Sequence, residues 1–386
     1  MTDRTVLTAL GLMSGTSMDG IDVALIRTDG ITVERCPGAF LTIPYAEAER
    51  EKLRAVLGFT GAVESVSRQI TEAHARAIRQ FLSIQGLGPQ DIDVIGFHGH
   101  TVLHRPDHGE TWQIGDGALL ARLTEMTVVD DFRIADVAAG GQGAPLVPIY
   151  HAALAVGEAR PLAVLNIGGV ANMTWIGPRI GEGEGNLLAF DTGPGNALID
   201  DWVWRRAGLP MDAGGALALA GQADEKRIRM WLNHPYFALR PPKSLDRDRF
   251  RVLLSEVSDL SLADGAATLA GFTAAVVGAA LPHLPEPPRR WLVTGGGRHN
   301  RGLMAALAAR VPGDVAPVEV VGWDGDALEA EAFAFLAVRS IKRLPLTFPG
   351  TTGVSSPMRG GRVSRPGAAG PAGGSFRLAF GGVRPA

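Results

Sequence analysis

The chain has 386 residues, a formal net charge of −3 at pH 7 and one cysteine, Cys36. Basic and acidic residues are mixed along the sequence without a basic stripe, which argues against nucleic acid and anionic membrane surfaces as partners. Chains longer than ~250 residues usually form more than one domain, so we expect two lobes. A single cysteine excludes an internal disulfide and fits a reducing compartment, so we expect a cytoplasmic protein that acts on a small molecule.

The first predicted feature is a polar turn between two apolar runs, residues 6–12 and 23–26. The turn contains glycines, hydroxyls and carboxylates, namely Ser14, Gly15, Thr16, Ser17, Asp19, Gly20 and Asp22. Glycines let backbone N–H groups approach an anionic ligand closely, and hydroxyls donate to the same oxygens. The carboxylates need a counter-charge, which the Mg²⁺ that accompanies a nucleotide supplies. We therefore expect a polyphosphate site on a strand–turn–strand hairpin, with an ordinary polar turn as the alternative.

Predicted strands and helices then alternate through the first half of the chain. Strands are expected at residues 33–43, 93–97 and 128–130, and helices at 45–56, 62–84 and 118–124. This alternation predicts an α/β layer structure.

The segment 131–148, DFRIADVAAGGQGAPLVP, has no clear period and is rich in glycine and alanine. Arg133 and Asp136 lie among its apolar residues, which is unusual for a flexible linker. We therefore place the segment in a cleft between the lobes, with a linker as the alternative.

The second half repeats the opening pattern. An apolar strand from residue 162, the turn NIGGVAN at 166–172 and a strand at 173–176 match the first hairpin, so two duplicated lobes are expected. A strand at 187–190 then runs into DTGPGN at 191–196. Further elements are a helix at 197–206, the strand and turn WLVTGGG at 291–297, and a strand at 318–321. The predicted lobes span residues 1–145 and 146–354, and the Gly- and Pro-rich tail 355–386 is predicted to be disordered or at most loosely packed.

Seven motifs, taken in order, resemble those of the anhydro-N-acetylmuramic acid kinases: GLMSGTSMDGID, GFHGHTVLHRP, QIGDG, DFRIADVAAGGQGAPLVP, LNIGGVANMT, FDTGPGN and TGGGRHN. The resemblance covers residues 6–354. It implies two duplicated actin-like, that is ribonuclease H-like, α/β lobes with a cleft between them, and a homodimer. It also implies an ATP-dependent kinase of peptidoglycan recycling. Such a kinase opens the 1,6-anhydro ring of 1,6-anhydro-N-acetylmuramic acid with water and phosphorylates O6, which gives N-acetylmuramic acid 6-phosphate and ADP.

The resemblance implies that Asp191 is the catalytic base, because it occupies the aspartate of the family's FD-x-GPGN motif. A carboxylate there would take a proton from water as the anomeric carbon gains positive character, as in an inverting glycosidase. The alternative is a helix N-cap, a position in which aspartate is common. Thr192 stands where the family often has cysteine.

The resemblance also implies ATP and Mg²⁺ as cofactors. Nucleotide contacts are expected from the first hairpin, from the second Gly-rich turn and from TGGG: Gly15, Thr16, Ser17, Met18, Asp19, Gly20, Ile21, Asp22, Gly168, Gly169, Gly295, Gly296 and Gly297. Phosphoryl transfer needs mainly positioning and charge neutralisation, so backbone N–H groups and hydroxyls suffice. Asp19 and Asp22 are the candidates to hold Mg²⁺ through water.

The sugar is expected between GFHGH and the DFR segment, with contacts from His98, His100, Thr101, Arg133 and Asp136. His98 and His100 are expected on one strand face, and Arg133 as a two-pronged donor to the lactyl carboxylate or the phosphate. A metal site formed with a third histidine is disfavoured because no cysteine or paired carboxylate completes it. Family members usually have glutamine in place of His100.

A later segment, PPKSLDR at 241–247, resembles a family PKSTGR loop. Two possibilities remain open for it, a contact with ligand and a solvated surface loop.

Two other functions remain open at this point. One is another sugar or carboxylate kinase of the same architecture, which would phosphorylate an existing group without hydrolysing a bond. The other is a nucleotide or muropeptide sensor without catalysis.

Overall fold

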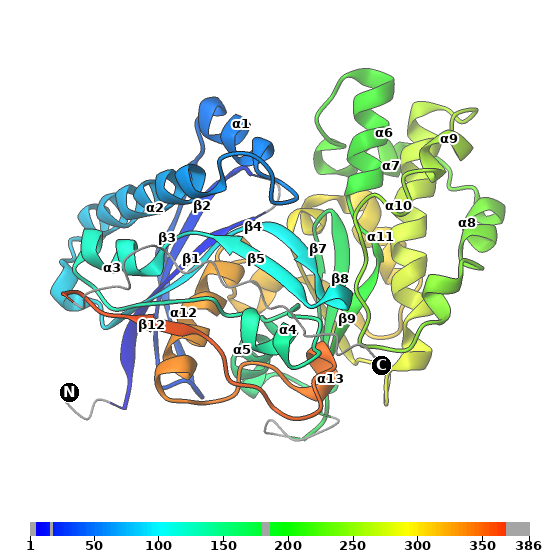
Figure 1. Ribbon diagram of the computed structural model, residues 1–386. Coiled ribbons are helices and arrows are strands. Elements are labelled where there is room, and N and C mark those ends of the chain that lie inside the picture. Colours follow the sequence, from blue (N-terminus) through cyan, green and yellow to red (C-terminus); the bar gives the residue numbers. More distant parts are fainter. Residues whose placement is uncertain (1–4, 16–17, 180–185, 368–386) are drawn as a thin grey trace, which may run out of the picture. The chain divides into compact units, whose positions relative to one another are not determined.

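The computed structural model describes residues 5–15, 18–179 and 186–367 (Figure 1). The chain divides into two compact units, Met1–Leu154 with Ala327–Ala386 (unit 1) and Ala155–Asp326 (unit 2). These ranges differ from the predicted lobes 1–145 and 146–354, because the chain returns to unit 1 at Ala327 and adds a long helix to its sheet.

Unit 1 is built on a seven-stranded sheet with the order β12-β6-β4-β1-β2-β3, in which β5 pairs with β4. The strands are β1 (Leu7–Ser14), β2 (Gly20–Thr28), β3 (Val33–Pro44), β4 (Val94–Arg105), β5 (Glu110–Ile114), β6 (Val128–Asp130) and β12 (Arg362–Ser364). The first three strands form an antiparallel meander, and β4 runs parallel to both β1 and β6.

Helices cover both faces of this sheet. They are α1 (Glu47–Ala55), α2 (Val63–Gln85), α3 (Gly117–Thr124), α4 (Ile134–Ala138), α5 (Pro148–Leu154), α12 (Leu328–Ile341) and α13 (Pro349–Thr352) (Figure 1). Leu10 and Leu12 of β1 belong to the same core cluster as the apolar residues of α2. Gly11 points the other way, since side chains alternate along a strand. A Cβ at Gly11 would lie 1.7 Å from the Ala330 carbonyl oxygen of α12, so only glycine allows this close helix–strand contact.

The prediction of a disordered tail from residue 355 is wrong for the residues up to 367. Strand β12 pairs antiparallel with β6 at the edge of the unit 1 sheet. Arg362 of β12 places its Nη2 2.5 Å from Asp130 Oδ2 and its Nη1 3.1 Å from Asp131 Oδ2. Backbone pairing and two acidic partners thus order a segment of low apolar content. Residues 368–386 lie outside the described residues.

Unit 2 repeats the sheet of unit 1. Its order is β11-β10-β7-β8-β9, with β7 (Leu162–Ile167), β8 (Val170–Ile176), β9 (Leu187–Pro194), β10 (Arg290–Thr294) and β11 (Asp314–Pro317). Here β7, β8 and β9 form the antiparallel meander, and β10 runs parallel to β7 and β11. The five-strand part β6-β4-β1-β2-β3 of the unit 1 sheet therefore recurs as β11-β10-β7-β8-β9, which confirms the predicted duplication of actin-like α/β lobes. The predicted strand 318–321 is wrong: these residues form a 3₁₀ turn, and the strand precedes them.

The helices of unit 2 are α6 (Ala197–Ala207), α7 (Ala216–Ala220), α8 (Glu225–Trp231), α9 (Leu253–Glu256), α10 (Leu262–Ala279) and α11 (Arg301–Ala308). By length and composition the segment Leu262–His283 could cross a membrane, but 78% of its apolar window is buried inside the protein. Leu269, Phe272 and Val276 of α10 lie in the core of unit 2, as expected for a buried small-residue helix.

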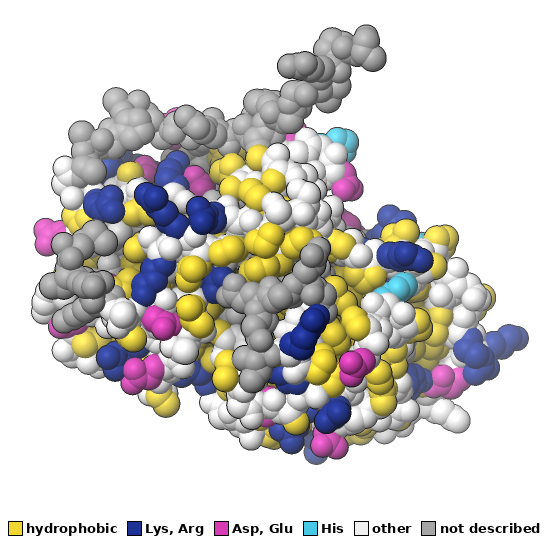
Figure 2. Space-filling view, turned by 90° about the horizontal axis from the view of Figure 1, so that it is seen from below, with side chains coloured by type: hydrophobic (Ala, Val, Ile, Leu, Met, Phe, Trp, Pro, Cys, Tyr) yellow, Lys and Arg dark blue, Asp and Glu magenta, His cyan; other side chains and the backbone are white. Residues whose placement is uncertain are grey.

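Charged side chains are dispersed on the face shown in Figure 2. Lys and Arg lie there among Asp, Glu and hydrophobic side chains and do not form one continuous stripe.

Candidate active site

Asp191 lies near the end of β9 and is held by hydrogen bonds from a single neighbouring segment. Its backbone N–H donates to the Lys243 carbonyl (3.0 Å), and its own carbonyl accepts from the Tyr236 hydroxyl (2.7 Å). The carboxylate Oδ2 accepts from the Leu245 N–H at 2.8 Å. Burial raises the pKa of the Asp191 carboxyl to about 7, although the Leu245 N–H lowers it. The structure thus presents a fixed carboxyl group that can both release and accept a proton near neutral pH.

The N-cap alternative for Asp191 is excluded, because the N-cap residue of α6 is Asn196. The Asn196 side chain does not cap the helix either, since its Nδ2 donates to the Ile167 carbonyl at 3.0 Å. Asp191 is therefore available for another role.

Lys243, in the PPKSLDR segment, is buried, so the alternative of a solvated loop is wrong for this residue. Its Nζ donates to the carbonyl oxygens of Tyr236 (3.1 Å) and Phe237 (3.4 Å) and lies 4.7 Å from the centre of the Tyr236 ring. Burial lowers the pKa of the Lys243 amine to about 8. The segment that binds Asp191 is thereby anchored to the core of unit 2.

The second Gly-rich turn and the GPGN turn of unit 2 bind each other. The carbonyls of Gly168 and Gly169 accept from the N–H groups of Asn196 (2.7 Å) and Gly195 (3.0 Å). Their carbonyls thus cover the N-terminal end of α6. The Gly168 N–H is also used within the turn, since it donates to the Val170 carbonyl at 3.2 Å.

The three glycines of TGGG have different surroundings. Gly295 has φ +73°, and a Cβ there would lie 2.3 Å from Asn166 Oδ1, whereas a Cβ at Gly297 would lie 2.5 Å from Ile167 Cγ2. Gly296 is exposed, and its nearest neighbour would be 3.5 Å away. Backbone conformation and packing account for Gly295 and Gly297, so Gly296 is the one whose bare backbone faces open space.

In unit 1 the polar turn connects β1 to β2, as predicted. The Met18 N–H donates to the Gly15 carbonyl at 3.0 Å, with Met18 at φ +58°. Asp19 is exposed, and Asp22 Oδ1 accepts from the Thr42 hydroxyl at 2.6 Å. Gly20 and Ile21 are buried, so they can offer a ligand only backbone groups. Thr16 and Ser17 lie outside the described residues.

His98 and His100 do not share a face of β4, contrary to prediction. Gly99 has φ +73° and interrupts the alternation between them. The His98 ring packs on Phe333 of α12, with ring centroids 4.6 Å apart. His100 Nδ1 instead lies 3.0 Å from the hydroxyl of Ser14, which follows Leu10 and Leu12 onto the α2 side of the sheet.

Buried His98 pairs with half-buried Arg133. The Nε and Nη2 atoms of Arg133 lie 3.2 and 3.0 Å from His98 Nε2, and its Nη1 donates to the Gly143 carbonyl at 2.7 Å. Burial and the Arg133 charge hold the pKa of His98 well below its usual value, so the ring is neutral. Since Nε2 accepts, the proton lies on Nδ1, which donates to the Gly99 carbonyl at 3.0 Å.

Asp136 is 2% exposed, and both its oxygens are used within the protein. Oδ1 accepts from the Gly143 N–H at 2.6 Å, and Oδ2 accepts from the hydroxyls of Thr352 (2.7 Å) and Thr347. This arrangement corrects the expected sugar contact, because the carboxylate ties the segment 131–148 to the chain around α13.

Thr101 is half-buried on β4, and its hydroxyl accepts from Gln113 Nε2 at 3.3 Å. Residues 5–15, 18–179 and 186–367 contain no group of three or more His, Cys, Asp or Glu side chains arranged to hold a metal ion. A histidine metal site is therefore absent from this part of the chain.

The sequence model of the anhydro-N-acetylmuramic acid kinase family matches residues 7–365. The chain belongs to this family. The anhydro-N-acetylmuramic acid kinase of Paramagnetospirillum magneticum is 56% identical over 355 residues, which cover 92% of this chain and 98% of that protein. The kinase of the same name from Rhodospirillum rubrum is 56% identical over 358 residues, covering 92% and 93%. This chain is therefore an ATP-dependent kinase.

Solved structures of lower similarity were also found. The activator of 2-hydroxyisocaproyl-CoA dehydratase from Clostridium difficile, with bound ADPNP, has a TM-score of 0.43 and 14% identity, covering 87% of this chain and 96% of that one. A ROK family glucokinase from Streptomyces griseus, in complex with glucose and AMPPNP, has a TM-score of 0.38 and 14% identity, covering 86% and 99%.

One charged residue near the polar turn was not among the site residues predicted from the sequence. Glu329 lies exposed in the first turn of α12 and interacts electrostatically with the Asp22 carboxylate and the Arg133 guanidinium. Two carboxylates and one guanidinium therefore gather beside the polar turn. In the sequence this glutamate stands between two apolar residues, Leu328 and Ala330, which are both buried. A charged residue between apolar residues of a helix is the pattern that could have indicated it.

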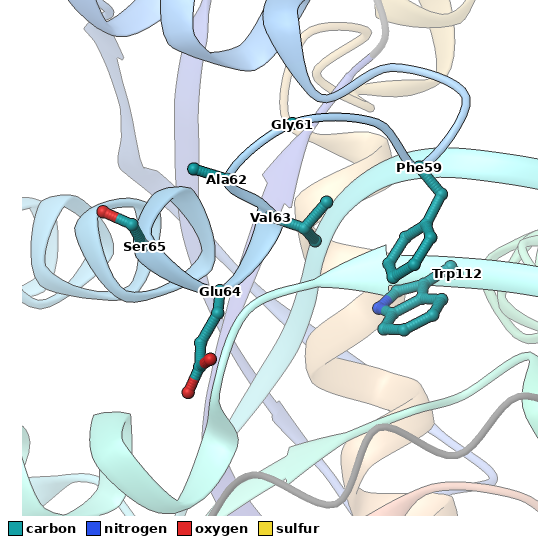
Figure 3. Close-up of a pocket in the computed structure, with 7 residues that line it drawn as sticks. All are labelled: Phe59, Gly61, Ala62, Val63, Glu64, Ser65 and Trp112. Atoms are coloured by element: carbon teal, nitrogen blue, oxygen red, sulfur yellow. The ribbon is translucent and has the colours of Figure 1, made fainter.

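A cavity of about 680 Å³ also opens on unit 1 of the kinase (Figure 3). It is lined by Phe59, Gly61, Ala62, Val63, Glu64, Ser65 and Trp112. Phe59 stacks on Trp112 with ring centroids 3.7 Å apart. None of the site residues predicted from the sequence lines this cavity.

Proposed function

We propose that this kinase hydrolyses the 1,6-anhydro bond of 1,6-anhydro-N-acetylmuramic acid while it transfers the γ-phosphoryl group of ATP to O6. The products are N-acetylmuramic acid 6-phosphate and ADP, and the reaction serves peptidoglycan recycling in the cytoplasm. The observation that carries the proposal is the Asp191 carboxyl, with its pKa raised to about 7 by burial and its position fixed by hydrogen bonds from Tyr236 and Leu245.

Asp191 acts as the general base for water. The carboxylate takes one proton from the attacking water, the water oxygen bonds to C1, and the C1–O6 bond breaks. The released O6 then bonds to the γ-phosphorus, and ADP leaves with the electrons of the broken P–O bond. A base is most effective when its pKa lies near the working pH, which supports Asp191 in this role.

By resemblance, nucleotide contacts are assigned within each unit separately, to the polar turn in unit 1 and to the Gly-rich turns in unit 2. We assign Gly15, Met18, Asp19, Gly20, Ile21 and Asp22, together with Gly168, Gly169, Gly295, Gly296 and Gly297; of these, Gly295 and Gly297 shape the turn for Gly296. Thr16 and Ser17 complete the assignment by resemblance. Backbone N–H groups that converge in a turn form concave sites for anions.

Mg²⁺ fits the donors present beside this turn. Asp19, which is exposed beside the turn, and Asp22 would hold it through water. Mg²⁺ keeps several waters and takes its other oxygens from phosphates, so it does not need a cage made by the protein alone. When bound, it neutralises charge on the transferred phosphoryl group.

The sugar is assigned to His98, Thr101 and Arg133. Because the His98 ring holds the Arg133 guanidinium, the orientation of the guanidinium is fixed before an anionic group arrives. Preorganised donors lose little freedom on binding. His100 and Asp136 contribute indirectly, through Ser14 and through the segment 131–148. The resemblance also supports a homodimer, which light scattering coupled to gel filtration would test.

The decisive experiment supplies ATP, Mg²⁺ and the anhydro-sugar in ¹⁸O-labelled water and determines the product by mass spectrometry. One heavy oxygen at C1 together with a phosphate is the expected result. A phosphorylated sugar without the label would indicate a kinase that does not hydrolyse a bond. Binding of ATP and sugar without any product would indicate a sensor.

A further inference from the structure

The segment 236–245 contacts Asp191 at three points. The Tyr236 hydroxyl donates to the Asp191 carbonyl (2.7 Å), and the Asp191 N–H donates to the Lys243 carbonyl (3.0 Å). The Leu245 N–H donates to Asp191 Oδ2 at 2.8 Å. The donors are two N–H groups and one hydroxyl that faces a carbonyl, so chemistry fixes the direction of all three bonds. Of the three, only the bond from Leu245 reaches the carboxyl group.

The Lys243 side chain connects the two ends of this segment. Its Nζ donates to the carbonyls of Tyr236 (3.1 Å) and Phe237 (3.4 Å), and both of these residues belong to the core of unit 2. Lys243 itself is only 9% exposed. One buried amine therefore ties the end of the segment that carries Leu245 to the end that is packed in the core.

We propose that Lys243 is a positioning residue for Asp191, because it holds the segment 236–245 in the shape that directs the Leu245 N–H to the carboxylate. It touches neither the carboxylate nor a reacting atom and acts through the backbone of its segment. This inference rests on the proposed function and deepens it, since it concerns the group that we assign as the base.

The Leu245 N–H is also the group through which Lys243 affects the ionisation of Asp191. Burial raises the pKa of the Asp191 carboxyl to about 7, and the Leu245 N–H lowers it because the bond favours the charged form. The residue that pairs with Asp191 on β8 is Asn172, which carries no charge. The titratable or charged groups that face Asp191 or its segment are Tyr236, Lys243, Arg249 and His283.

The contacts of Lys243 persist over the pH range in which Asp191 titrates. Burial lowers the pKa of the Lys243 amine to about 8. The ammonium has three N–H donors and the neutral amine has two, so either form can supply both carbonyls. The Tyr236 phenol keeps its proton throughout, because burial raises its pKa far above neutral pH.

The test compares Lys243→Met with the wild type in the full chain. Methionine keeps an unbranched side chain of similar length but has no N–H, so the Leu245 N–H is no longer held in place. The pKa of the Asp191 carboxyl should rise by about one pH unit, the effect of one hydrogen bond to a charged group. The rising limb of kcat/KM should move from about pH 7 to about pH 8. Turnover should therefore fall about fivefold at pH 7 and recover by pH 9, a pattern that a general loss of structure does not produce.

Arg339→Met is the matched control in unit 1. The Arg339 guanidinium is also buried, lies over the Phe335 ring and donates to two main-chain carbonyls, those of Gly30 and Pro345 (2.7 Å each). Its loss should lower the melting temperature and leave the rising limb near pH 7.

A second variant, Lys243→Gln, keeps N–H donors on a side chain that is one bond shorter. These donors no longer reach both carbonyls, so the limb should move in the same direction by a smaller amount. This variant carries the test if Lys243→Met does not fold.

A second measurement reads the carboxyl group without turnover. In protein labelled with ¹³C at the side-chain carboxyl of aspartate, the Asp191 signal is assigned by its absence in Asp191→Asn. In an NMR titration this signal should change at a pH about one unit higher in Lys243→Met than in the wild type.

The outcomes separate the two proposals. If the Asp191 carboxyl titrates at the same pH in the wild type and in the Lys243 variants, Lys243 does not position it, and the proposed function stands. If the wild type forms no phosphorylated sugar, the proposed function is wrong, and the carbon spectrum still decides whether Lys243 holds the Leu245 N–H against the carboxylate.

Discussion

The sharpest prediction concerns the pH dependence of turnover. If Asp191, with a pKa of about 7, is the general base, the active ionised form is about 9% of the enzyme at pH 6 and about 91% at pH 8. We therefore expect kcat/KM for the anhydro-sugar to rise about tenfold between these pH values. A base with the ordinary pKa of an aspartate, 3.8, would give a flat profile over this range.

The assay measures initial rates from pH 5 to 9 at saturating ATP. Excess Mg²⁺ keeps the nucleotide in its metal-bound, fully ionised form, so that the titration reports on the enzyme. Asp191→Asn keeps the size of the side chain and should lose at least ~100-fold in turnover, the scale of general-base catalysis, together with the rising limb.

A neighbouring carboxyl provides the matched control. Burial raises the pKa of Asp200, in α6, to about 6, yet the proposed mechanism gives it no role. Asp200→Asn should keep the rising limb near pH 7. A limb that survives in Asp191→Asn, or that disappears in Asp200→Asn, would refute the assignment of the base.

Three further predictions concern stability and the Gly-rich turn. Asp136→Ala should lower the free energy of unfolding by about 3 kcal/mol, measured by urea denaturation, because it leaves three buried donors without an acceptor; unchanged stability with weaker sugar binding would restore the sugar contact. Arg362→Ala should lower the melting temperature more at pH 8 than at pH 5. Burial and the Asp130 charge raise the pKa of Asp131 to about 6, so protonation of Asp131 at pH 5 removes the charge that Arg362 neutralises. Gly295→Ala should destabilise the fold, whereas Gly296→Ala should melt like the wild type and raise the KM for ATP about fivefold; an unchanged KM would remove Gly296 from the nucleotide site.

Local sequence patterns were sufficient to predict much of the fold. The helices predicted at 45–56 and 62–84 are α1 and α2, because apolar residues at three- and four-residue spacing match the stripe that packs on the sheet. The repeated strand–turn–strand pattern predicted the duplication, since both units begin with the same antiparallel meander. These features depend on neighbours close in sequence.

The features that were missed depend on distant neighbours or on a single backbone angle. The Asp136 carboxylate accepts hydrogen bonds from Thr347 and Thr352, which lie more than two hundred positions later in the chain. No local sequence pattern predicts these contacts. The tail has low apolar content, but its strand β12 pairs with β6 at the edge of the sheet. Arg362 of β12 forms ion pairs there with Asp130 and Asp131. Gly99 adopts a left-handed backbone conformation, so His98 and His100 do not share the face of β4 that was predicted for both.

Some glycines of the family motifs are required by packing and not by catalysis. Gly11 and Gly96 allow β1 and β4 to approach the backbone of α12, where a Cβ would lie 1.7 and 2.0 Å from a carbonyl oxygen. Their presence in the motifs is therefore required by packing, with or without a nucleotide. A chain could keep these glycines and the duplicated sheets and still lack catalysis. In the proposed mechanism, hydrolysis of the anhydro bond depends on the Asp191 carboxyl, because its raised pKa suits a general base and the Leu245 N–H fixes its position.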